Sequence, residues 1–454
     1  MIMEIIRNVN ELYINMLGMN PVKLDAKYRW SKLIVSLDID DGKVLFSGLS
    51  RAIVFLHNSE LDNLYDIKTY EFLYRMYFLV PEDYNEIEAV NMLRNKLRIP
   101  VDDLYLNFIN RYTILPTLAC NARCEYCYES KLKHKRNMTP ATALKVAEFI
   151  LRKSTHTDTV RLSWFGGEPL VNYKAIDLII NQLKNNGKRV ESEIITNGYL
   201  IDDKMMKKFV ENWGIYSVQI TLDGVGEVYN RIKNYVNVKE NAYQRIVNNI
   251  KMLLSAGIIV NIRLNVTLEN GDALLEVVED MNAIFGARSG LRIYCRAIFE
   301  EGKPRTEEEN KPIYDSILKI ESKLKEYEFS IGQNCDENMT IVQCMADDGR
   351  SVLIDPEGNL GTCEHHVADD FYGNVGNSDI DFDILNGWRD YGQDKDICKD
   401  CPVYTECLRP NKCIELRNCD RVVRDYRIHQ YKEGLERLYL DYRMNNMIPS
   451  ALML

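Results

Sequence analysis

The stretch LACNARCEYCYES, residues 118–130, places three cysteines on one short segment, at Cys120, Cys124 and Cys127. It directly follows RYTILPT, residues 111–117, whose β-branched and aromatic residues predict a strand. Three thiolates in the spacing CxxxCxxC can hold three irons of a cubane [4Fe–4S] cluster and leave the fourth iron without a protein ligand. Zinc or redox thiols are the alternatives, but zinc would need a fourth Cys or His at hand. The segment therefore predicts a reactive iron–sulfur centre at the end of a strand.

Short apolar strands alternate with amphipathic helices from this motif to about residue 300. Thr139 and Pro140 predict the cap and first turn of a helix over residues 141–153. Such alternation predicts a parallel sheet whose ligands bind at the carboxyl ends of the strands. With residues 111–117, the further predicted strands make six units and a partial barrel over residues 106–300: they are 159–165, 192–198, 216–223, 258–266 and 291–299.

Length and composition exclude several classes of protein. With 454 residues, 46% hydrophobic and 27% charged, the chain is not collagen-like, mucin-like or disordered. Its net charge of −10 provides no positive field for a nucleic-acid backbone, so we expect no nucleic-acid partner. The sequence has no secretory signal and no apolar stretch of the ~18 residues that span a bilayer. We therefore expect no membrane partner and a cytoplasmic location.

Residues 1–105 predict a small α+β module. Two segments rich in β-branched and aromatic residues, 32–39 and 43–56, flank the turn dipeptide Asp41-Gly42 and predict paired strands. A sheet edge of this module could accept an extended peptide as an added strand. Packing or dimerisation is the alternative role. Helical patterns surround the strands at residues 10–17, 67–79 and 85–98.

Residues 331–454 are rich in cysteine, glycine and aspartate, which is typical of a region organised by metals rather than by a hydrophobic core. Residues 421–446 predict a closing helix, and residues 301–330 predict a connecting helix with a charged, solvated face. Of 12 cysteines, eight lie between Cys335 and Cys419, whereas Cys295 is isolated and is predicted to be a buried thiol. Reducing conditions disfavour disulfides, so the clustered cysteines predict metal binding.

The motif WFGGEP, residues 164–169, follows the second predicted strand. Together with the CxxxCxxC segment, it resembles radical S-adenosylmethionine (SAM) enzymes. The resemblance implies that Gly166, Gly167 and Glu168 bind the methionyl amino group of SAM, as glycines permit close backbone approach and an ammonium needs acceptors. It also implies that Tyr126 lies near the adenine, with an exposed loop tyrosine as the alternative.

Two more motifs fall at the carboxyl ends of predicted strands: ITNG, which contains Asn197, and TLDG, which contains Thr221. The resemblance implies that these residues contact the ribose and carboxylate of SAM, although each motif could be a simple turn.

The sequence leaves open which basic residue contacts the SAM carboxylate. Relatives often carry His-Asp-x-x-Arg after the TLDG glycine, where this chain reads YNRIK, residues 229–233. The contact is therefore open between Lys233, Arg231 and Arg263. The strand period of two places Arg263 and Asn265 on one face, which favours an inward pair.

The carboxyl-terminal cysteines resemble the SPASM extension of this superfamily, which carries two auxiliary iron–sulfur clusters. Cys344, Gly358 and Cys363 fit its opening element, but Cys413 follows Cys407 by five residues in place of the usual three, which softens the assignment of ligands there. The resemblance implies three [4Fe–4S] clusters in all. A distal cluster would use Cys398, Cys401, Cys407 and Cys419, and a nearer cluster would use Cys344, Cys363 and Cys413.

The sequence leaves two alternatives for the ligands of the nearer cluster. Nine cysteines remain outside the first trio and two fully ligated clusters need eight, so Cys335 could close the nearer cluster. Alternatively that cluster keeps an iron open to substrate and Cys335 is a bystander. His365 and His366 are further possible ligands, with exposed loop histidines as the alternative.

The resemblance covers nearly the whole chain and implies a peptide maturase, with most similarity to those of six-cysteine SCIFF peptides. It implies a partial (β/α)6 TIM-like radical SAM barrel, a winged-helix-like amino-terminal module that binds the leader of a precursor peptide, and a SPASM domain. The implied reaction is an intramolecular Cys-to-Thr thioether (sactionine) crosslink, driven by a 5′-deoxyadenosyl radical and supplied with electrons by a flavodoxin or ferredoxin.

Another SPASM enzyme, such as an anaerobic sulfatase maturase forming formylglycine, is an alternative, as is a non-catalytic iron–sulfur electron carrier or a zinc-stapled interaction protein. Sequence does not indicate which peptide residues are joined, nor the oligomeric state.

Overall fold

A computed structural model of the chain describes residues 3–8, 11–23, 25–61, 64, 68, 70–97, 109–127, 136–238, 240–299, 303–331, 344–346, 348–366, 370–377, 379–388, 396–407, 413 and 419–447. None of the helices in these ranges is both long and apolar enough to cross a membrane.

Six parallel strands, adjacent in space in the order of the chain, form the centre of the largest sheet. They confirm the six predicted strands and the α/β partial barrel, because neighbouring parallel strands need a crossover between them. The strands are β7 (Arg111–Ile114), β8 (Thr159–Trp164), β9 (Arg189–Ile195), β10 (Ile215–Thr221), β11 (Ile259–Val266) and β12 (Leu291–Ala297).

Helices between these strands bury one apolar face each in a common core. The predicted cap of the first helix is confirmed, since the Thr139 side chain accepts a hydrogen bond from the Thr142 amide at 3.1 Å and Pro140 opens the helix. The helical segments are α4 (Pro140–Lys153), η4 (Pro169–Asn172), α5 (Tyr173–Asn185), α6 (Asp203–Lys207), η5 (Lys208–Trp213), α7 (Gly226–Lys233), α8 (Ala242–Ser255) and α9 (Gly271–Phe285).

The predicted connecting helix is α10 (Glu307–Glu326), which has the expected exposed, charged face and also a buried apolar face. It packs against α9 and β12, and Ile313, Ile317 and Leu324 are buried on its inner face. Most of its charged residues lie on the outer side, but Glu321 is buried and accepts a hydrogen bond from the Tyr426 hydroxyl at 2.6 Å. α10 therefore packs on the barrel as the helix that follows its sixth parallel strand.

The cysteine-rich zone is continuous with the barrel sheet. β14 (Ser351–Ile354) pairs in parallel with β7, and β15 (Asn359–Gly361) and β16 (Gly373–Asn374) extend the sheet antiparallel. β13 (Ser330–Ile331) pairs with β12 at the opposite edge. The predicted boundary at residue 331 therefore divides one sheet. The remaining elements of this zone are η6 (Glu364–His366), α11 (Phe382–Gly387), η7 (Asp396–Asp400), η8 (Tyr404–Glu406) and α13 (Arg421–Met447).

The amino-terminal module is a four-stranded antiparallel sheet in the order β1-β5-β4-β3. The single strand predicted over residues 43–56 is wrong, because the chain turns between residues 48 and 52 with Arg51 at a positive φ of 66°. The sheet strands are β1 (Glu4–Arg7), β3 (Ile34–Ile39), β4 (Gly42–Ser47) and β5 (Ile53–His57).

The helices of the module match the sequence patterns in two cases of three. α1 (Glu11–Leu17) and α3 (Glu86–Leu97) lie where expected, and η1 (Asn58–Glu60) follows β5. The pattern over residues 67–79 is wrong beyond one short helix, α2 (Glu71–Arg75), since the chain then turns into β6 (Leu79–Pro81), which pairs with β2 (Tyr28–Trp30).

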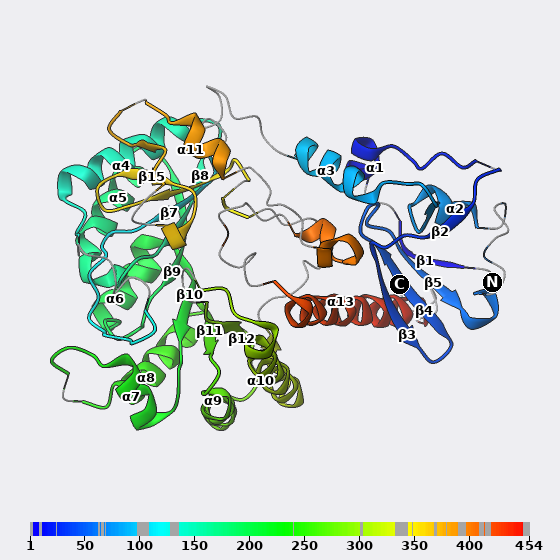
Figure 1. The fold of residues 1–454 in the computed structure, drawn as a ribbon. Helices are drawn as coiled ribbons and strands as arrows, with labels where there is room; N and C mark the ends of the chain where they lie inside the picture. The colour runs from blue at the N-terminus through cyan, green and yellow to red at the C-terminus, as the bar shows by residue number, and fades with distance from the viewer. Residues whose placement is uncertain are drawn as a thin grey trace, which may run out of the picture.

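α13, predicted as the closing helix, joins the two halves of the molecule (Figure 1). At its start, Asn310 of α10 donates a hydrogen bond to Asp420 at 2.7 Å. Farther along, α13 covers one face of the amino-terminal sheet, where Tyr431 stacks on Phe46 and Leu435 is fully buried. The module and the carboxyl-terminal zone therefore share a hydrophobic core.

Candidate active site

The loop of residues 117–127, called here the cluster loop, follows β7 and brings the predicted trio together. The thiols of Cys120, Cys124 and Cys127 are half-buried. Burial raises the pKa of Cys120 to about 12, and the nearby charges of Glu168, Cys124 and Cys127 act in the same direction. The amide of Cys127 donates to the carbonyl of Cys124 at 3.2 Å, which folds the loop tightly between these residues.

The two glycines of WFGGEP let β8 and its continuation run directly alongside the cluster loop. A Cβ at Gly166 would lie 2.4 Å from the Thr117 oxygen, and one at Gly167 would lie 2.6 Å from the Ala119 oxygen. Gly166 also has a φ of +116°, which L side chains rarely adopt. Both glycines therefore position the residues that lead into Cys120.

Glu168 joins the segments that follow β8 and β9. Its side chain is fully buried and accepts hydrogen bonds from the Leu170 amide at 3.1 Å, the Thr196 hydroxyl at 2.7 Å and the Asn197 amide at 2.8 Å. Burial raises the pKa of its carboxyl to about 6. A carboxylate offers about four acceptor positions, so one is left for a bound ammonium.

Asn197 lies against the cluster loop. Its amide nitrogen donates to the Asn121 side chain at 2.7 Å and lies 3.8 Å from the Cys120 sulfur. The turn of ITNG is also held from behind, where Arg245 donates to the Tyr199 carbonyl and Asn249 donates to the Gly198 carbonyl, both at 2.8 Å.

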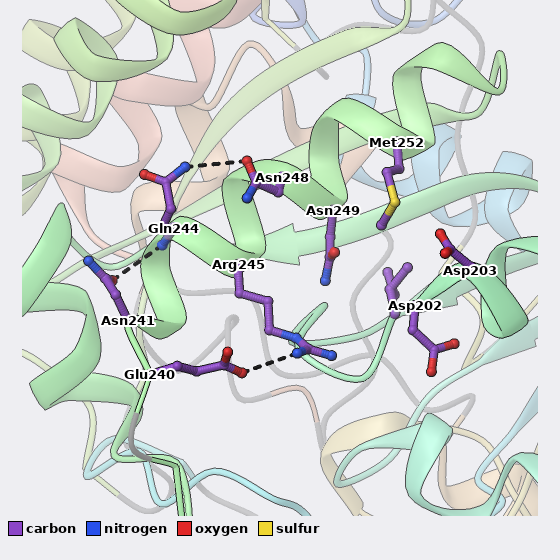
Figure 2. A pocket seen from close by; sticks show the side chains of 10 residues that line it. Asp202, Asp203, Glu240, Asn241, Gln244, Arg245, Asn248, Asn249 and Met252 are labelled. Atoms are coloured by element: carbon purple, nitrogen blue, oxygen red, sulfur yellow. Dashed lines mark hydrogen bonds and ion pairs between the residues drawn. The ribbon is translucent and has the colours of Figure 1, made fainter.

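Arg245 and Asn249 also line a hollow of about 510 Å³ on the outer side of this turn (Figure 2). Arg245 is paired there with Glu240 at 3.1 Å. Since these polar groups already hold the turn, we interpret the side chains around the hollow as support for the turn rather than as a separate binding site.

Thr221, at the carboxyl end of β10, is the register partner of Arg263 in the neighbouring strand β11. The Arg263 guanidinium donates to the Asn265 side chain at 2.8 Å, as their shared face requires. Arg263 is half-buried, whereas Arg231 is exposed.

Sequence reasoning missed a buried triad of Tyr126, Asp223 and Lys233. The Lys233 ammonium lies 2.8 Å from the Asp223 carboxylate and 3.1 Å from the Tyr126 hydroxyl, which itself donates to Asp223 at 2.8 Å. Burial alone would lower the pKa of Lys233, but Asp223 opposes it and the pKa is raised well above its usual value. Lys233 is thus already paired. Of the three basic candidates for the contact with the SAM carboxylate, Arg263 is therefore the best placed. The signal available in the sequence was a lysine where relatives carry arginine.

Residues 233–236 hold the cluster loop from its other side. The Arg123 amide donates to the Lys233 carbonyl at 2.9 Å, and the Val236 amide donates to the Asn121 carbonyl at 2.8 Å. The Tyr126 anchor and these two backbone bonds fix the loop against the end of α7.

Two of the carboxyl-terminal cysteines, Cys363 and Cys401, have different cysteines as neighbours. Burial raises the pKa of Cys363 above its usual range, and Glu364, Cys344 and Cys413 add to the shift. Burial raises the pKa of Cys401 to about 12, and Cys407, Cys419 and Cys398 add to that shift. A neighbouring thiolate has this effect only at short range.

The groups formed by Cys344, Cys363 and Cys413, and by Cys398, Cys401, Cys407 and Cys419, are called here the nearer and distal cysteine groups. Cys335 lies outside the described residues, and Cys295 is buried on β12, in neither group.

The thiol donors fit iron–sulfur clusters, which are held by cysteine thiolates. Within the described ranges, no three His, Cys, Asp or Glu side chains converge closely enough to hold one metal ion. Cysteines that each bind a different iron of a cluster stand farther apart than ligands of a single ion. Beside the trio, Asp223 Oδ1 is buried without a hydrogen-bond partner in the described structure, and a polar group of a bound cofactor would satisfy it.

Comparison with known proteins agrees with this geometry. Residues 114–281 match the model of the radical SAM superfamily. Radical SAM cyclopropyl synthase TigE of Paramaledivibacter caminithermalis is 26% identical over 224 residues, which are 43% of this chain and 45% of TigE. The chain thus spans less than half the length of that relative.

Two solved structures share the fold. One is anSMEcpe with bound AdoMet and the Cp18Cys peptide, with a TM-score of 0.51 at 18% identity over 73% of this chain and 99% of that one. The other is Streptococcus suis SuiB bound to precursor peptide SuiA, with a TM-score of 0.50 at 14% identity over 87% of this chain and 100% of that one. The matched barrel and the three-cysteine loop at its carboxyl-terminal end together make residues 114–281 similar to the radical SAM superfamily.

Proposed function

We propose that this chain modifies a ribosomally made, cysteine-rich precursor peptide and installs an intramolecular Cys-to-Thr thioether crosslink. The observation that carries the proposal is the combination of the barrel with two further cysteine groups and an amino-terminal sheet module. SuiB, which has the same fold over 87% of this chain, is described with a bound precursor peptide, and anSMEcpe with a bound peptide. β1 and β3 are the edge strands of the module and are the candidate sites for an added leader strand.

The residues around the cluster loop have separable roles. Cys120, Cys124 and Cys127 would hold the reactive cluster, and Glu168 would bind the methionyl ammonium through its remaining lone pair. With the cluster and SAM bound, these residues would hold the groups that supply radical hydrogen-abstraction chemistry at the substrate. Tyr126, Asn197, Thr221 and Arg263 would orient the adenosine and carboxylate of SAM. Fixing these groups before reaction is how a protein directs such chemistry to one position.

The function is tested by incubating the anaerobically reconstituted, reduced enzyme with SAM and a candidate precursor peptide. We expect 5′-deoxyadenosine together with a peptide that has lost two hydrogens and one alkylatable thiol. A product that reacts with a hydrazide would indicate an aldehyde and favour formylglycine formation. SAM cleavage without any change in the peptide would contradict the choice of substrate, and no SAM cleavage would contradict the enzyme assignment.

Leader binding is best measured on the full chain. Removal of residues 1–95 would uncover the core that the module shares with α13, so loss of activity would not isolate a role in binding. We expect the precursor to bind much more tightly with its leader than without it, in a fluorescence titration.

Glu168 predicts that SAM affinity depends on pH. Burial raises its pKa from 4.5 to about 6, and below that pH the neutral carboxyl cannot balance an ammonium. We expect affinity to be constant above about pH 7 and to fall about tenfold per unit below about pH 6. Equilibrium dialysis of cluster-loaded protein measures this. Glu168→Gln should weaken binding and remove the pH dependence, and an unchanged pH profile in that variant would assign the titration to another group.

The nearer cysteine group predicts different outcomes for two cysteines. Cys363→Ala should lose the nearer cluster and the crosslinked product, because Cys363 lies with Cys344 and Cys413. Cys335→Ala should keep all clusters and substantial crosslinking if one iron is open to the substrate thiolate. Iron content and product mass are the measurements. Loss of iron in Cys335→Ala would mean that the cluster is closed and can only transfer electrons.

A further inference from the structure

The loop of residues 396–407, called here the distal loop, carries three cysteines of the distal group. It consists of η7 and η8 joined by a turn, and the Cys401 amide donates to the Cys398 carbonyl at 3.2 Å. Such short turns bury little apolar surface of their own, so the position of the loop depends on what packs against it.

A buried arginine of the amino-terminal module holds the distal loop. Arg94 of α3 has 2% of its surface exposed and donates to the Tyr404 carbonyl at 2.7 Å and to the Cys407 carbonyl at 2.9 Å. Its guanidinium lies over the Tyr404 ring at 4.3 Å and donates to the Tyr404 hydroxyl at 3.2 Å. Charge-assisted hydrogen bonds away from water are among the strongest contacts in a protein.

The turn after β4 meets the same loop. A Cβ at Gly48 would lie 2.7 Å from the Thr405 hydroxyl oxygen, and Thr405 is fully buried. Cys398 and Cys401 pack against an apolar cluster of the module that includes Leu33 and Val80. Helix, turn and core of the module therefore all contact the distal loop.

We infer that the amino-terminal module is a structural part of the distal cluster site, and that Arg94 is the positioning residue that links the two. The inference rests on the proposed auxiliary clusters. Arg94 sets the backbone at Cys407, and its buried positive charge beside the distal cysteine group stabilises the reduced form of a bound cluster. A peptide that binds the module therefore contacts a part of the protein that packs directly against the distal cluster site.

The test uses full-length protein, reconstituted anaerobically, with iron counted per chain and the cluster potentials followed by electron paramagnetic resonance during a redox titration. Arg94→Gln removes the charge and Arg94→Lys keeps it. We expect the potential of the distal cluster to fall in Arg94→Gln and to stay near that of the wild type in Arg94→Lys. Arg94→Met, which removes every donor, should lose about a third of the iron while SAM cleavage without peptide continues.

Matched controls isolate the link. Arg75→Met removes an exposed arginine of the same module, paired with Glu71 on α2, and should leave iron and potentials unchanged. Gly48→Ala places a methyl group against Thr405 from the turn after β4. This change should therefore also reduce the amount of iron bound at the distal cluster. Full iron and unchanged potentials in Arg94→Gln and Gly48→Ala would overturn the inference. If wild-type protein carries no distal cluster, the proposed cofactors fail instead, and if Arg94→Met does not fold, the Gln and Lys pair decides.

Discussion

Replacing Cys120, Cys124 and Cys127 together with Ala is expected to abolish SAM cleavage and to remove about a third of the iron, as one of three clusters is lost. The three thiols share one loop, and no other described cysteine lies beside Glu168 and Asn197 to replace them. Chromatography of 5′-deoxyadenosine and iron analysis are the measurements.

The matched control is Cys295→Ala. This thiol is buried on β12 in neither carboxyl-terminal group, and its removal should leave iron and SAM cleavage intact. Formation of 5′-deoxyadenosine by the triple variant would show that the reactive cluster lies elsewhere.

Lys233→Met is expected to destabilise the fold by about 3–5 kcal/mol and to weaken SAM binding strongly, because it leaves the buried Asp223 carboxylate without its cation. The side chains of Lys233 and Asp223 are only 4% and 2% exposed, so water cannot replace the lost partner. The Tyr126 hydroxyl also loses one of its two anchors, which loosens the cluster loop. Thermal unfolding and SAM titration are the measurements.

Two further variants separate the effect of charge from that of packing. Lys233→Arg retains the cation and should recover much of the stability, whereas Lys208→Met breaks a half-buried pair with Asp177, remote from the loop, and should leave SAM binding unchanged. An unaltered melting temperature and SAM affinity in Lys233→Met would contradict a supporting role for the triad.

The sequence was most informative where chemistry and periodicity coincide. The six barrel strands are short apolar segments that alternate with amphipathic helices, and the three-cysteine motif lies directly after the first of them. The split of residues 43–56 was missed although Ser47, Gly48, Ser50 and Arg51 interrupt the apolar run, because apolar segments on both sides were read as one strand. The positive φ of Arg51 is rare for its residue type and is not indicated by the local pattern.

Long-range pairing accounts for the other differences. The parallel pairing of β14 with β7 joins segments about 240 residues apart, and neither segment has a sequence feature that identifies its partner strand. The contact of Arg94 with residues 404 and 407 likewise depends on tertiary arrangement, since an arginine in an amphipathic helix is ordinarily read as a surface residue. The same holds for Lys233, because its pairing with Asp223 depends on how the end of α7 packs against the end of β10.

The length of α13 has a consequence for how the molecule opens. The helix runs for 27 residues, about 40 Å, from the residue pair Cys419–Asp420 to the face of the amino-terminal sheet. A helix of this length is stiff, and it packs against the barrel-side core near its start, at Val423, and against the amino-terminal sheet farther along, at Leu435. We therefore expect the amides between these two contacts to exchange with solvent only when the sheet and the barrel-side anchor release together. The amino-terminal module is then no detachable domain but one half of a single cooperative unfolding unit.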